Sequence, residues 1–207
     1  MQKIALIYMG GTFGCIGEPL MPMPEQAFLP LLEKIIPPHL QVECFAAPSI
    51  KDSSACTAVD WLQLIQQIQQ LQHNNYQYFV IIHGTDTLSY AAATLARFLG
   101  DSCHAIITGS QYPLLNIEGN DTREFTDALG NLYLALEQVL KLPEGVYLAF
   151  YQQVFHAQTT LKVHTTELDA FTGIPATKEC LTSTNQFIVK DDHITQAAQL
   201  CVLNLML

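Results

Sequence analysis

The stretch Ile81-Ile82-His83-Gly84-Thr85-Asp86-Thr87-Leu88 joins an apolar run to the start of a helical pattern, and it places two threonine hydroxyls and one carboxylate at the junction. The apolar, β-rich run of residues 78–82 predicts a short strand, and the apolar residues after Thr87 recur at helical spacing. The polar residues therefore lie on a strand-to-helix turn. Because open α/β sheets bind their ligands at such turns, this stretch predicts both the type of fold and the position of a site.

A second turn of the same kind opens the chain. Residues 4–8 predict a buried parallel strand that leads through Gly10 and Gly11 to Thr12. The two glycines allow positive φ angles and a close approach of the backbone to a ligand. A Gly-Gly-Thr turn by itself is more often ordinary turn chemistry than a site. Because parallel strands bring their carboxyl ends to one edge of the sheet, two hydroxyl-bearing turns together indicate a site at that edge.

The rest of the pattern alternates strands with helices. Further strands are predicted at 41–46, 105–109 and 146–150, and helices at 27–36, 61–71, 88–99 and from Asp121 to Leu140. Thr57 and Asp60 resemble a capping box before the second of these helices, whose glutamines are interpreted as its solvated face. Short β-like pieces follow residue 152, at 154–155, 161–163 and 187–189. The predicted fold class is α/β: a mostly parallel, open, Rossmann-like sheet flanked by helices, with an antiparallel edge hairpin.

Composition narrows the class of protein. The chain has 207 residues, 49% of them hydrophobic, and a net charge of −10, which disfavours nucleic acid or an anionic membrane as a partner. Six scattered cysteines without metal-like spacing are interpreted as small hydrophobes in a reducing cytosol, in preference to disulfides or a metal site. The first strand begins almost at Met1, and no apolar run reaches transmembrane length, so we expect a cytoplasmic protein without a leader or a membrane span.

Five motifs occur in an order that identifies a family. They are Tyr8-Met9-Gly10-Gly11-Thr12, Asp52-Ser53-Ser54, His83-Gly84-Thr85-Asp86-Thr87, Ile107-Thr108-Gly109-Ser110-Gln111, and Lys162-Val163-His164 followed by Asp169-Ala170-Phe171. Across nearly its whole length the chain resembles bacterial L-asparaginases, most closely the cytoplasmic type I branch. The resemblance implies an amidohydrolase that converts L-asparagine to L-aspartate and ammonia through a covalent acyl-enzyme, with no metal and no organic cofactor.

The resemblance also assigns roles to residues. Thr12 matches the family's nucleophile, and Thr85, Asp86 and Lys162 match its hydroxyl–carboxylate–lysine relay. The chemistry agrees, because a threonine hydroxyl is a poor nucleophile unless a neighbouring base, such as an amine held away from water, takes its proton. Without the resemblance, Lys162 is most simply an exposed loop lysine, whereas His83 is interpreted as a hydrogen-bonded structural residue in either case.

A small zwitterionic substrate needs contacts at both of its ends. Asp86 is expected to attract the α-ammonium group, while Ser53, with Ser54 and Asp52, holds the α-carboxylate. Backbone N–H groups at Thr12 and Thr85 are expected to face the oxyanion that develops on the side-chain carbonyl. The predicted substrate-binding residues are Gly11, Asp52, Ser53, Ser54, Thr85 and Asp86.

The chain also departs from the family pattern. Residues 13–25 contain no tyrosine, although family members usually carry one in this loop, and Leu20 stands near its expected place. We expect residues 1–190 to form the family's N-terminal α/β domain, and residues 191–207 to form a connector and the first strand of an otherwise absent C-terminal domain. That exposed apolar strand predicts a homodimer or a higher oligomer.

Alternatives remain open at this point. The main one is an inactive amino-acid-binding or regulatory remnant of an asparaginase, which has kept the substrate contacts without turnover. An amidotransferase subunit that works on charged tRNA is disfavoured by the acidic balance. The sequence does not separate asparagine from glutamine as the substrate, because one methylene is worth only about 1–3 kcal/mol.

Overall fold

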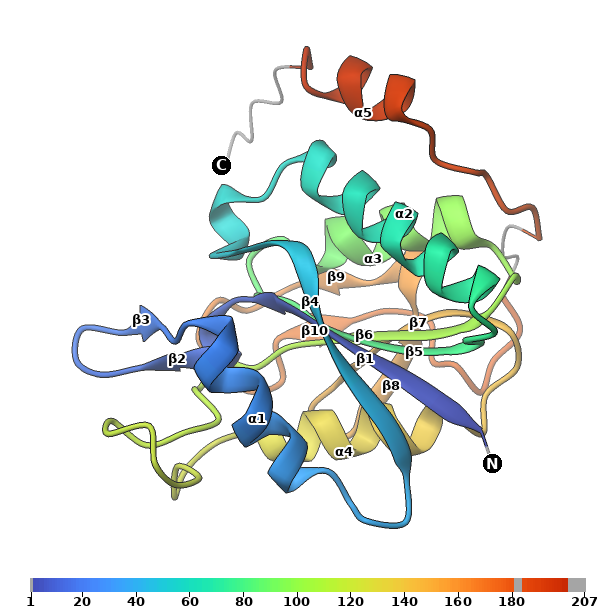
Figure 1. The fold of residues 1–207 in the computed structure, drawn as a ribbon. Helices are drawn as coiled ribbons and strands as arrows, with labels where there is room; N and C mark the ends of the chain where they lie inside the picture. The colour runs from blue at the N-terminus through green and yellow to red at the C-terminus, as the bar shows by residue number, and fades with distance from the viewer. Residues whose placement is uncertain (1, 181–183, 201–207) are drawn as a thin grey trace.

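A computed structural model describes residues 2–180 and 184–200 and shows one six-stranded sheet. In spatial order its strands are β4 (Gln41–Lys51), β1 (Lys3–Gly10), β5 (Tyr78–Ile82), β6 (His104–Thr108), β7 (Gly145–Phe150) and β8 (Gln153–His156) (Figure 1). The first five strands are parallel, and β8 pairs antiparallel with β7 at the edge. The predicted α/β class with its antiparallel edge hairpin is therefore confirmed.

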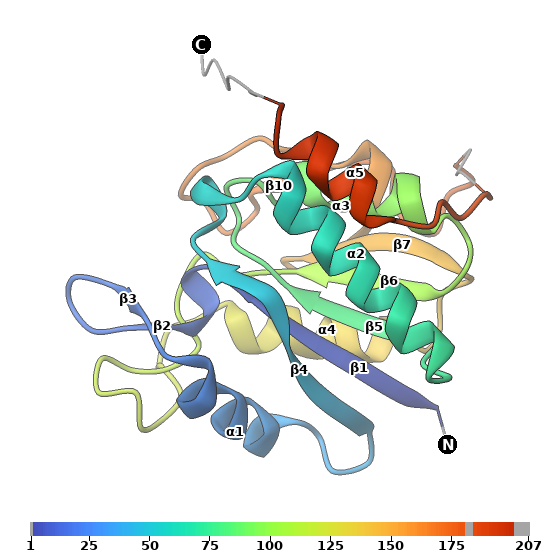
Figure 2. The same ribbon diagram turned by 45° about the horizontal axis from the view of Figure 1, so that its top comes forward.

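Helices cover both faces of the sheet (Figures 1 and 2). One face carries α2 (Ala58–His73) and α3 (Leu88–Leu99), and the other carries α1 (Glu25–Ile35) and α4 (Ala128–Gln138). A fifth helix, α5 (Asp191–Ala197), packs on the outer side of α2. Crossover connections in a parallel sheet place helices on both of its faces, so its strands are buried on both sides. The continuous apolar runs in the sequence are typical of such strands.

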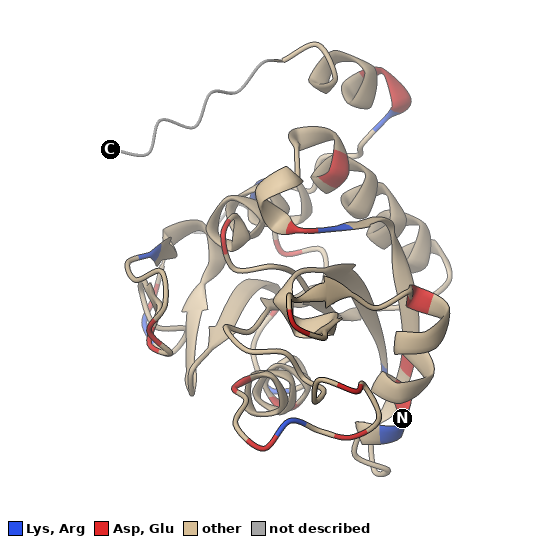
Figure 3. Cartoon of the chain, turned by 90° about the vertical axis from the view of Figure 1, so that its left-hand side faces the viewer, with Lys and Arg blue, Asp and Glu red and all other residues tan. Residues whose placement is uncertain are grey.

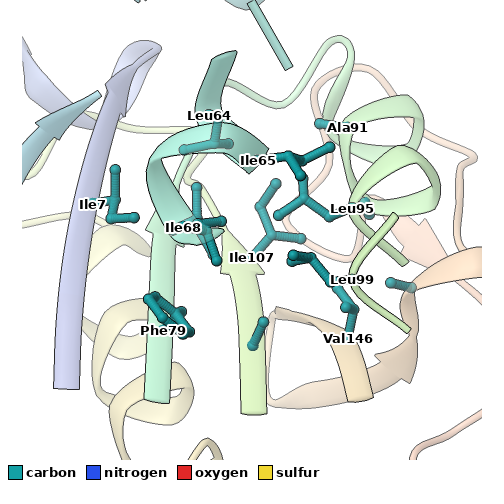
Figure 4. Close-up of a cluster of buried hydrophobic side chains, with 14 of the residues drawn as sticks. Ile7, Leu64, Ile65, Ile68, Phe79, Ala91, Leu95, Leu99, Ile107 and Val146 are labelled. Carbon is teal, nitrogen blue, oxygen red and sulfur yellow. The ribbon is translucent and has the colours of Figure 1, made fainter. Parts of the chain in front are cut away.

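Each central strand contributes to two hydrophobic clusters. Alternate residues of β1 point to opposite faces, so Ile7 packs toward α2 and α3 whereas Leu6 packs toward α1 and α4. Figure 4 shows the first cluster, in which Ile65 of α2 and Leu95 of α3 meet side chains from the sheet. Burial of one such side chain stabilises the fold by roughly 1.5–3 kcal/mol. The two clusters fix the strands and thereby the turns at their carboxyl ends.

The long helix predicted from Asp121 is wrong at its start. Helix α4 begins at Ala128, and residues 121–127 form a loop. The reason is Asp127, whose carboxylate accepts the backbone N–H groups of Gln111 and Tyr112. Phe125, which fitted the helical period, lies exposed and contacts the Tyr112 ring edge-on. Local polar contacts therefore override the apolar periodicity there.

The glutamine face of α2 is not simply solvated. Gln69 is buried, donates to the Phe187 carbonyl oxygen at 2.8 Å and accepts the Val189 N–H at 3.0 Å. Residues 187–189 therefore lie against α2 in irregular structure and do not form the predicted strand. Residues 191–193, predicted to be a connector, form the start of helix α5. Of the strand predicted at 200–207, the structure describes only Leu200.

Two small hairpins complete the fold near the site. Strand β2 (Cys15–Ile16) pairs with β3 (Met21–Pro22), and β9 (Leu161–Lys162) pairs with β10 (Phe171–Thr172). Short 3₁₀ turns are η1 (Thr12–Gly14), η2 (Ser53–Ala55) and η3 (Ala157–Thr159). The sequence predicted a β-like piece at 161–163, where β9 lies, but neither its partner β10 nor the β2–β3 hairpin.

Candidate active site

The motif residues meet where the parallel strands end, on the side of the molecule that faces the viewer in Figure 3. The turn after β1 touches the turn after β5, since a Cβ atom placed on Gly11 would lie 2.3 Å from the Gly84 Cα. Likewise, a Cβ atom on Gly84 would lie 2.5 Å from the Ser53 Oγ. Glycine at these positions therefore lets three turns approach more closely than any side chain would allow.

Thr12 is the residue after Gly11 and so lies beside the contact between the two turns. It begins η1, where the preceding Gly11 has φ 80° and ψ −178°, a backbone conformation available essentially only to glycine. Its side chain is half-buried, and among the described residues neither the Thr12 N–H nor the Thr85 N–H donates a hydrogen bond. Two backbone donors thus flank the Gly11–Gly84 contact without an acceptor.

Lys162 connects the two polar residues of the β5 turn. Its Nζ donates to the Thr85 Oγ1 at 3.0 Å and to the Asp86 Oδ1 at 3.0 Å. Only 15% of the lysine side chain is exposed, against 60% for Asp86, so the amine is largely shielded while the carboxylate opens to solvent. Strand β9 holds the lysine there through its pairing with β10. The exposed loop lysine that residue type alone predicts is therefore not what the structure shows.

The β4 turn contributes its predicted residues in two ways. Ser53 is buried; its Oγ accepts the Asp86 N–H at 3.2 Å, and its carbonyl oxygen accepts the Thr87 hydroxyl at 2.8 Å. Asp52 and Ser54 are exposed and paired, since the Asp52 carboxylate accepts the Ser54 N–H and hydroxyl. Ser53 therefore fixes the turn that carries Asp86, whereas Asp52 and Ser54 form its solvent-facing rim.

Gln111 joins this group, although no individual role is predicted for it from the sequence. The Thr85 hydroxyl donates to the Gln111 Oε1 at 3.3 Å. The Gln111 Nε2 donates to the carbonyl oxygens of Thr165 at 3.1 Å and Glu167 at 2.9 Å, in the loop after β9. The amide is thus oriented with its oxygen toward Thr85. Its place in a quoted motif was the only signal in the sequence.

Residues at the start of helix α4 hold the turn that carries Gln111. Asp127 accepts the Gln111 N–H at 2.9 Å and an amide proton of Asn131 at 3.1 Å. Asn131 is buried and also donates to the Gly109 carbonyl oxygen, while its Oδ1 accepts the Tyr151 N–H. This network ties the end of β6 to the β7–β8 turn.

His83 makes the structural contacts that its position predicted. Its Nδ1 lies 2.8 Å from the Gly84 carbonyl oxygen, and its Nε2 accepts the indole N–H of Trp61 at 3.2 Å. Burial lowers the pKa of the imidazole, and this outweighs the opposing effects of the Gly84 hydrogen bond and of the Asp60 and Asp52 carboxylates. His83 therefore stays neutral and is not placed to exchange protons with solvent.

Other side chains contribute little to the site. Leu20, near the position of the family's loop tyrosine, is 48% exposed at the β2–β3 turn. Burial raises the pKa of the Cys44 and Cys103 thiols to about 12 and that of Cys56 to about 11, so these cysteines are protonated at neutral pH. Cys201 lies outside the described residues.

Residues 2–180 and 184–200 contain no group of three or more histidine, cysteine, aspartate or glutamate side chains arranged to hold a metal ion. Within the same ranges no helix is both long and apolar enough to cross a bilayer. Acidic residues are spread over several loops, with few lysines or arginines among them (Figure 3).

Comparison with known proteins places these motifs in context. The family described as "Asparaginase, N-terminal" matches residues 3–194. L-asparaginase 1 of Escherichia coli K12 is 30% identical over 190 residues, which cover 83% of this chain and 51% of that protein. The 60 kDa lysophospholipase of Mus musculus is 30% identical over 199 residues, covering 82% of this chain and 34% of that protein. The chain thus spans about half the length of the bacterial relative, or less for the mouse protein.

Solved structures show the same likeness. L-asparaginase I from Vibrio cholerae superimposes with a TM-score of 0.69 at 29% identity, over 83% of this chain and 51% of the other. The L-asparaginase from Thermococcus kodakarensis gives 0.67 at 26% identity, over 84% and 51%. A probable cytoplasmic L-asparaginase from Campylobacter jejuni gives 0.69 at 23% identity, which supports the fold alone.

Proposed function

Since the chain belongs to the asparaginase family, as its N-terminal domain, we propose that it hydrolyses the side-chain amide of L-asparagine, with Thr12 as nucleophile. The observation that carries the proposal is the position of Lys162, whose amine contacts both the Thr85 hydroxyl and the Asp86 carboxylate at 3.0 Å. Lys162 lies 77 residues after Thr85 and 76 after Asp86, so the fold has to bring its amine to that adjacent hydroxyl and carboxylate.

The proposed reaction has two halves. The Thr12 hydroxyl attacks the amide carbon, its proton passes through Thr85 to the amine form of Lys162, and ammonia leaves after taking up that proton. Water then attacks the resulting aspartyl ester and releases L-aspartate. Asp86 holds the amine beside Thr85 throughout. The unpaired N–H groups of Thr12 and Thr85 support this scheme, because they are the two donors an oxyanion would need on either side of the Gly11–Gly84 contact.

The exposed groups suit a zwitterionic substrate. The Asp86 carboxylate keeps 60% of its side-chain surface exposed, which leaves one face for an α-ammonium group. The Ser53 hydroxyl accepts from the Asp86 N–H and so retains its own proton for an α-carboxylate, with Ser54 and Asp52 at the rim. We assign no cofactor, and we propose a cytoplasmic protein that works as a homodimer or higher oligomer.

A second candidate keeps the same contacts without turnover. The absence of tyrosine from residues 13–25 favours it, since that residue helps activate the nucleophile in family members. In this alternative the chain binds amino acids, and Thr12 remains unacylated. Asparagine binding measured by calorimetry without ammonia release would support it over the hydrolase.

Replacement of Thr12 tests the proposal directly. Thr12→Ala is expected to abolish ammonia release from L-asparagine, because no hydroxyl remains to form the ester, while the far-ultraviolet circular dichroism stays unchanged. Thr94→Ala is the matched control, since the hydroxyl of this half-buried threonine of α3 donates to the Tyr90 carbonyl oxygen of its own helix. Wild-type ammonia release by Thr12→Ala would exclude Thr12 as the nucleophile.

A further inference from the structure

We propose that His83, held by Trp61, is a positioning residue that aims the Thr85 backbone N–H at the reacting carbonyl oxygen. The inference rests on the proposed function for its catalytic consequence. Its structural basis is the continuous chain of contacts from the Trp61 indole through the His83 ring to the Gly84 carbonyl oxygen.

The hydrogen bonds fix the protonation state of the ring. An indole nitrogen can only donate, so the His83 Nε2 must be the unprotonated acceptor of the Trp61 N–H at 3.2 Å. The proton of a neutral imidazole then resides on Nδ1 and is donated to the Gly84 carbonyl oxygen at 2.8 Å. Both hydrogen bonds therefore require the same tautomer, the one that carries its proton on Nδ1.

The peptide between Gly84 and Thr85 transmits this orientation. A trans peptide is planar, so its C=O and N–H bonds point in opposite directions. When His83 holds the Gly84 carbonyl oxygen, the Thr85 N–H is directed away from the His83 ring. That N–H has no acceptor among the described residues, although Thr85 is 7% exposed. A hydrogen bond to the carbonyl also polarises the peptide and makes its N–H a stronger donor.

Trp61 is itself anchored by the start of α2. The Asp60 carboxylate accepts the Thr57 N–H at 2.7 Å, as the predicted capping box requires, and pairs with Lys51 of β4 at 2.8 Å. Trp61 lies in the first turn of α2, and its backbone N–H donates to the Thr57 carbonyl oxygen. The backbone of Trp61 is therefore anchored, and its side chain packs against the first hydrophobic cluster, from where the indole reaches His83.

The experiment compares variants of His83 that restore a hydrogen-bond donor to the Gly84 carbonyl oxygen with variants that do not. In His83→Asn the amide nitrogen can take the place of Nδ1 and reach the Gly84 carbonyl oxygen, whereas in His83→Gln it reaches the place of Nε2 instead. His83→Leu removes both contacts. Trp61→Phe, at a half-buried position, is a milder variant for the case in which the buried leucine prevents folding. Thermal unfolding checks each variant.

Two readouts are used. Selective ¹⁵N-threonine labelling follows the Thr85 amide resonance, assigned by its loss in Thr85→Ser, and this measurement needs no turnover. We expect an upfield amide proton shift in His83→Leu and His83→Gln, a smaller one in Trp61→Phe, and near wild-type values in His83→Asn. In kinetics, kcat is expected to fall by about 10- to 100-fold in His83→Leu with KM little changed, because only stabilisation of the oxyanion is lost.

The outcomes separate the two proposals. A folded wild-type chain that releases no ammonia would contradict the proposed function, and the Thr85 amide signal would still decide the role of His83. An unchanged Thr85 resonance in the leucine and glutamine variants, or in a folded Trp61→Phe if the leucine variant does not fold, would overturn the positioning role. Equal losses of kcat in the asparagine and glutamine variants would do the same.

Discussion

Gly11→Ala is expected to disable the site and to weaken the fold. The new Cβ atom would lie 2.3 Å from the Gly84 Cα, and ordinary contact begins at 3.4 Å, so the turns must separate by about 1.1 Å. A misplacement of about 1 Å costs on the order of 100-fold in rate. At φ 80° and ψ −178° alanine pays roughly 1–3 kcal/mol in backbone strain, and overpacking adds roughly 1–3 kcal/mol. A loss near 4 kcal/mol corresponds to a fall in Tm of about 8–16 °C.

The assay pairs ammonia release with denaturant unfolding, and the control is Gly130→Ala. Gly130 is exposed in α4, and an added Cβ atom meets nothing within 4 Å, so alanine there is expected to stabilise the chain by about 0.5–1 kcal/mol and to leave turnover unchanged. If Gly11→Ala matched the wild type in stability and rate, the close approach of the two turns would not be a requirement of this site.

Three further outcomes are expected. Lys162→Arg should abolish ammonia release although it keeps the charge, because arginine stays protonated at any working pH; retained activity would assign the base elsewhere. Burial in the folded chain lowers the pKa of His83, so the unfolded chain binds more protons than the folded chain below about pH 6.5. The free energy of unfolding should therefore decrease as the pH falls through that value, and His83→Asn should flatten this dependence in urea titrations. Gln69→Ala should leave the Phe187 carbonyl oxygen and the buried Val189 N–H without their partner and speed hydrogen exchange of the Val189 amide, whereas Gln70→Ala at an exposed position should not.

Local patterns predicted the sheet and most helices because strand and helix periods are properties of short segments. The apolar runs at 4–8 and 78–82 gave strands within one or two residues of their observed bounds. The pattern failed where a polar side chain far along the chain was the partner. Asp127 draws residues 121–127 into a loop, and Gln69 holds residues 187–189 away from any sheet.

The members of the candidate site were also readable from the sequence, but their geometry was not. Motif order pointed to Thr85, Asp86 and Lys162, and the glycines after β1 pointed to a close backbone approach. The hydrogen bond between Lys162 and Thr85 joins residues 77 apart, and it is the β9–β10 hairpin, held by Gln111, that carries the lysine to the end of β5. Gln111 and Trp61 gave no signal of their own, since a glutamine in a turn and a tryptophan on an amphipathic helix have ordinary structural uses.

By itself the sequence determined the α/β class, the turns that carry polar groups and the family to which the chain belongs. Backbone propensity, apolar period and motif order are all recorded along the chain, so they need no knowledge of distance in space. Only the tertiary structure decided which groups touch: the lysine on Thr85 and Asp86, the amide of Gln111 on the same hydroxyl, and the indole of Trp61 on His83. Hydrogen bonds act over about 3 Å, and whether two side chains come that close depends on the packing of both faces of the sheet.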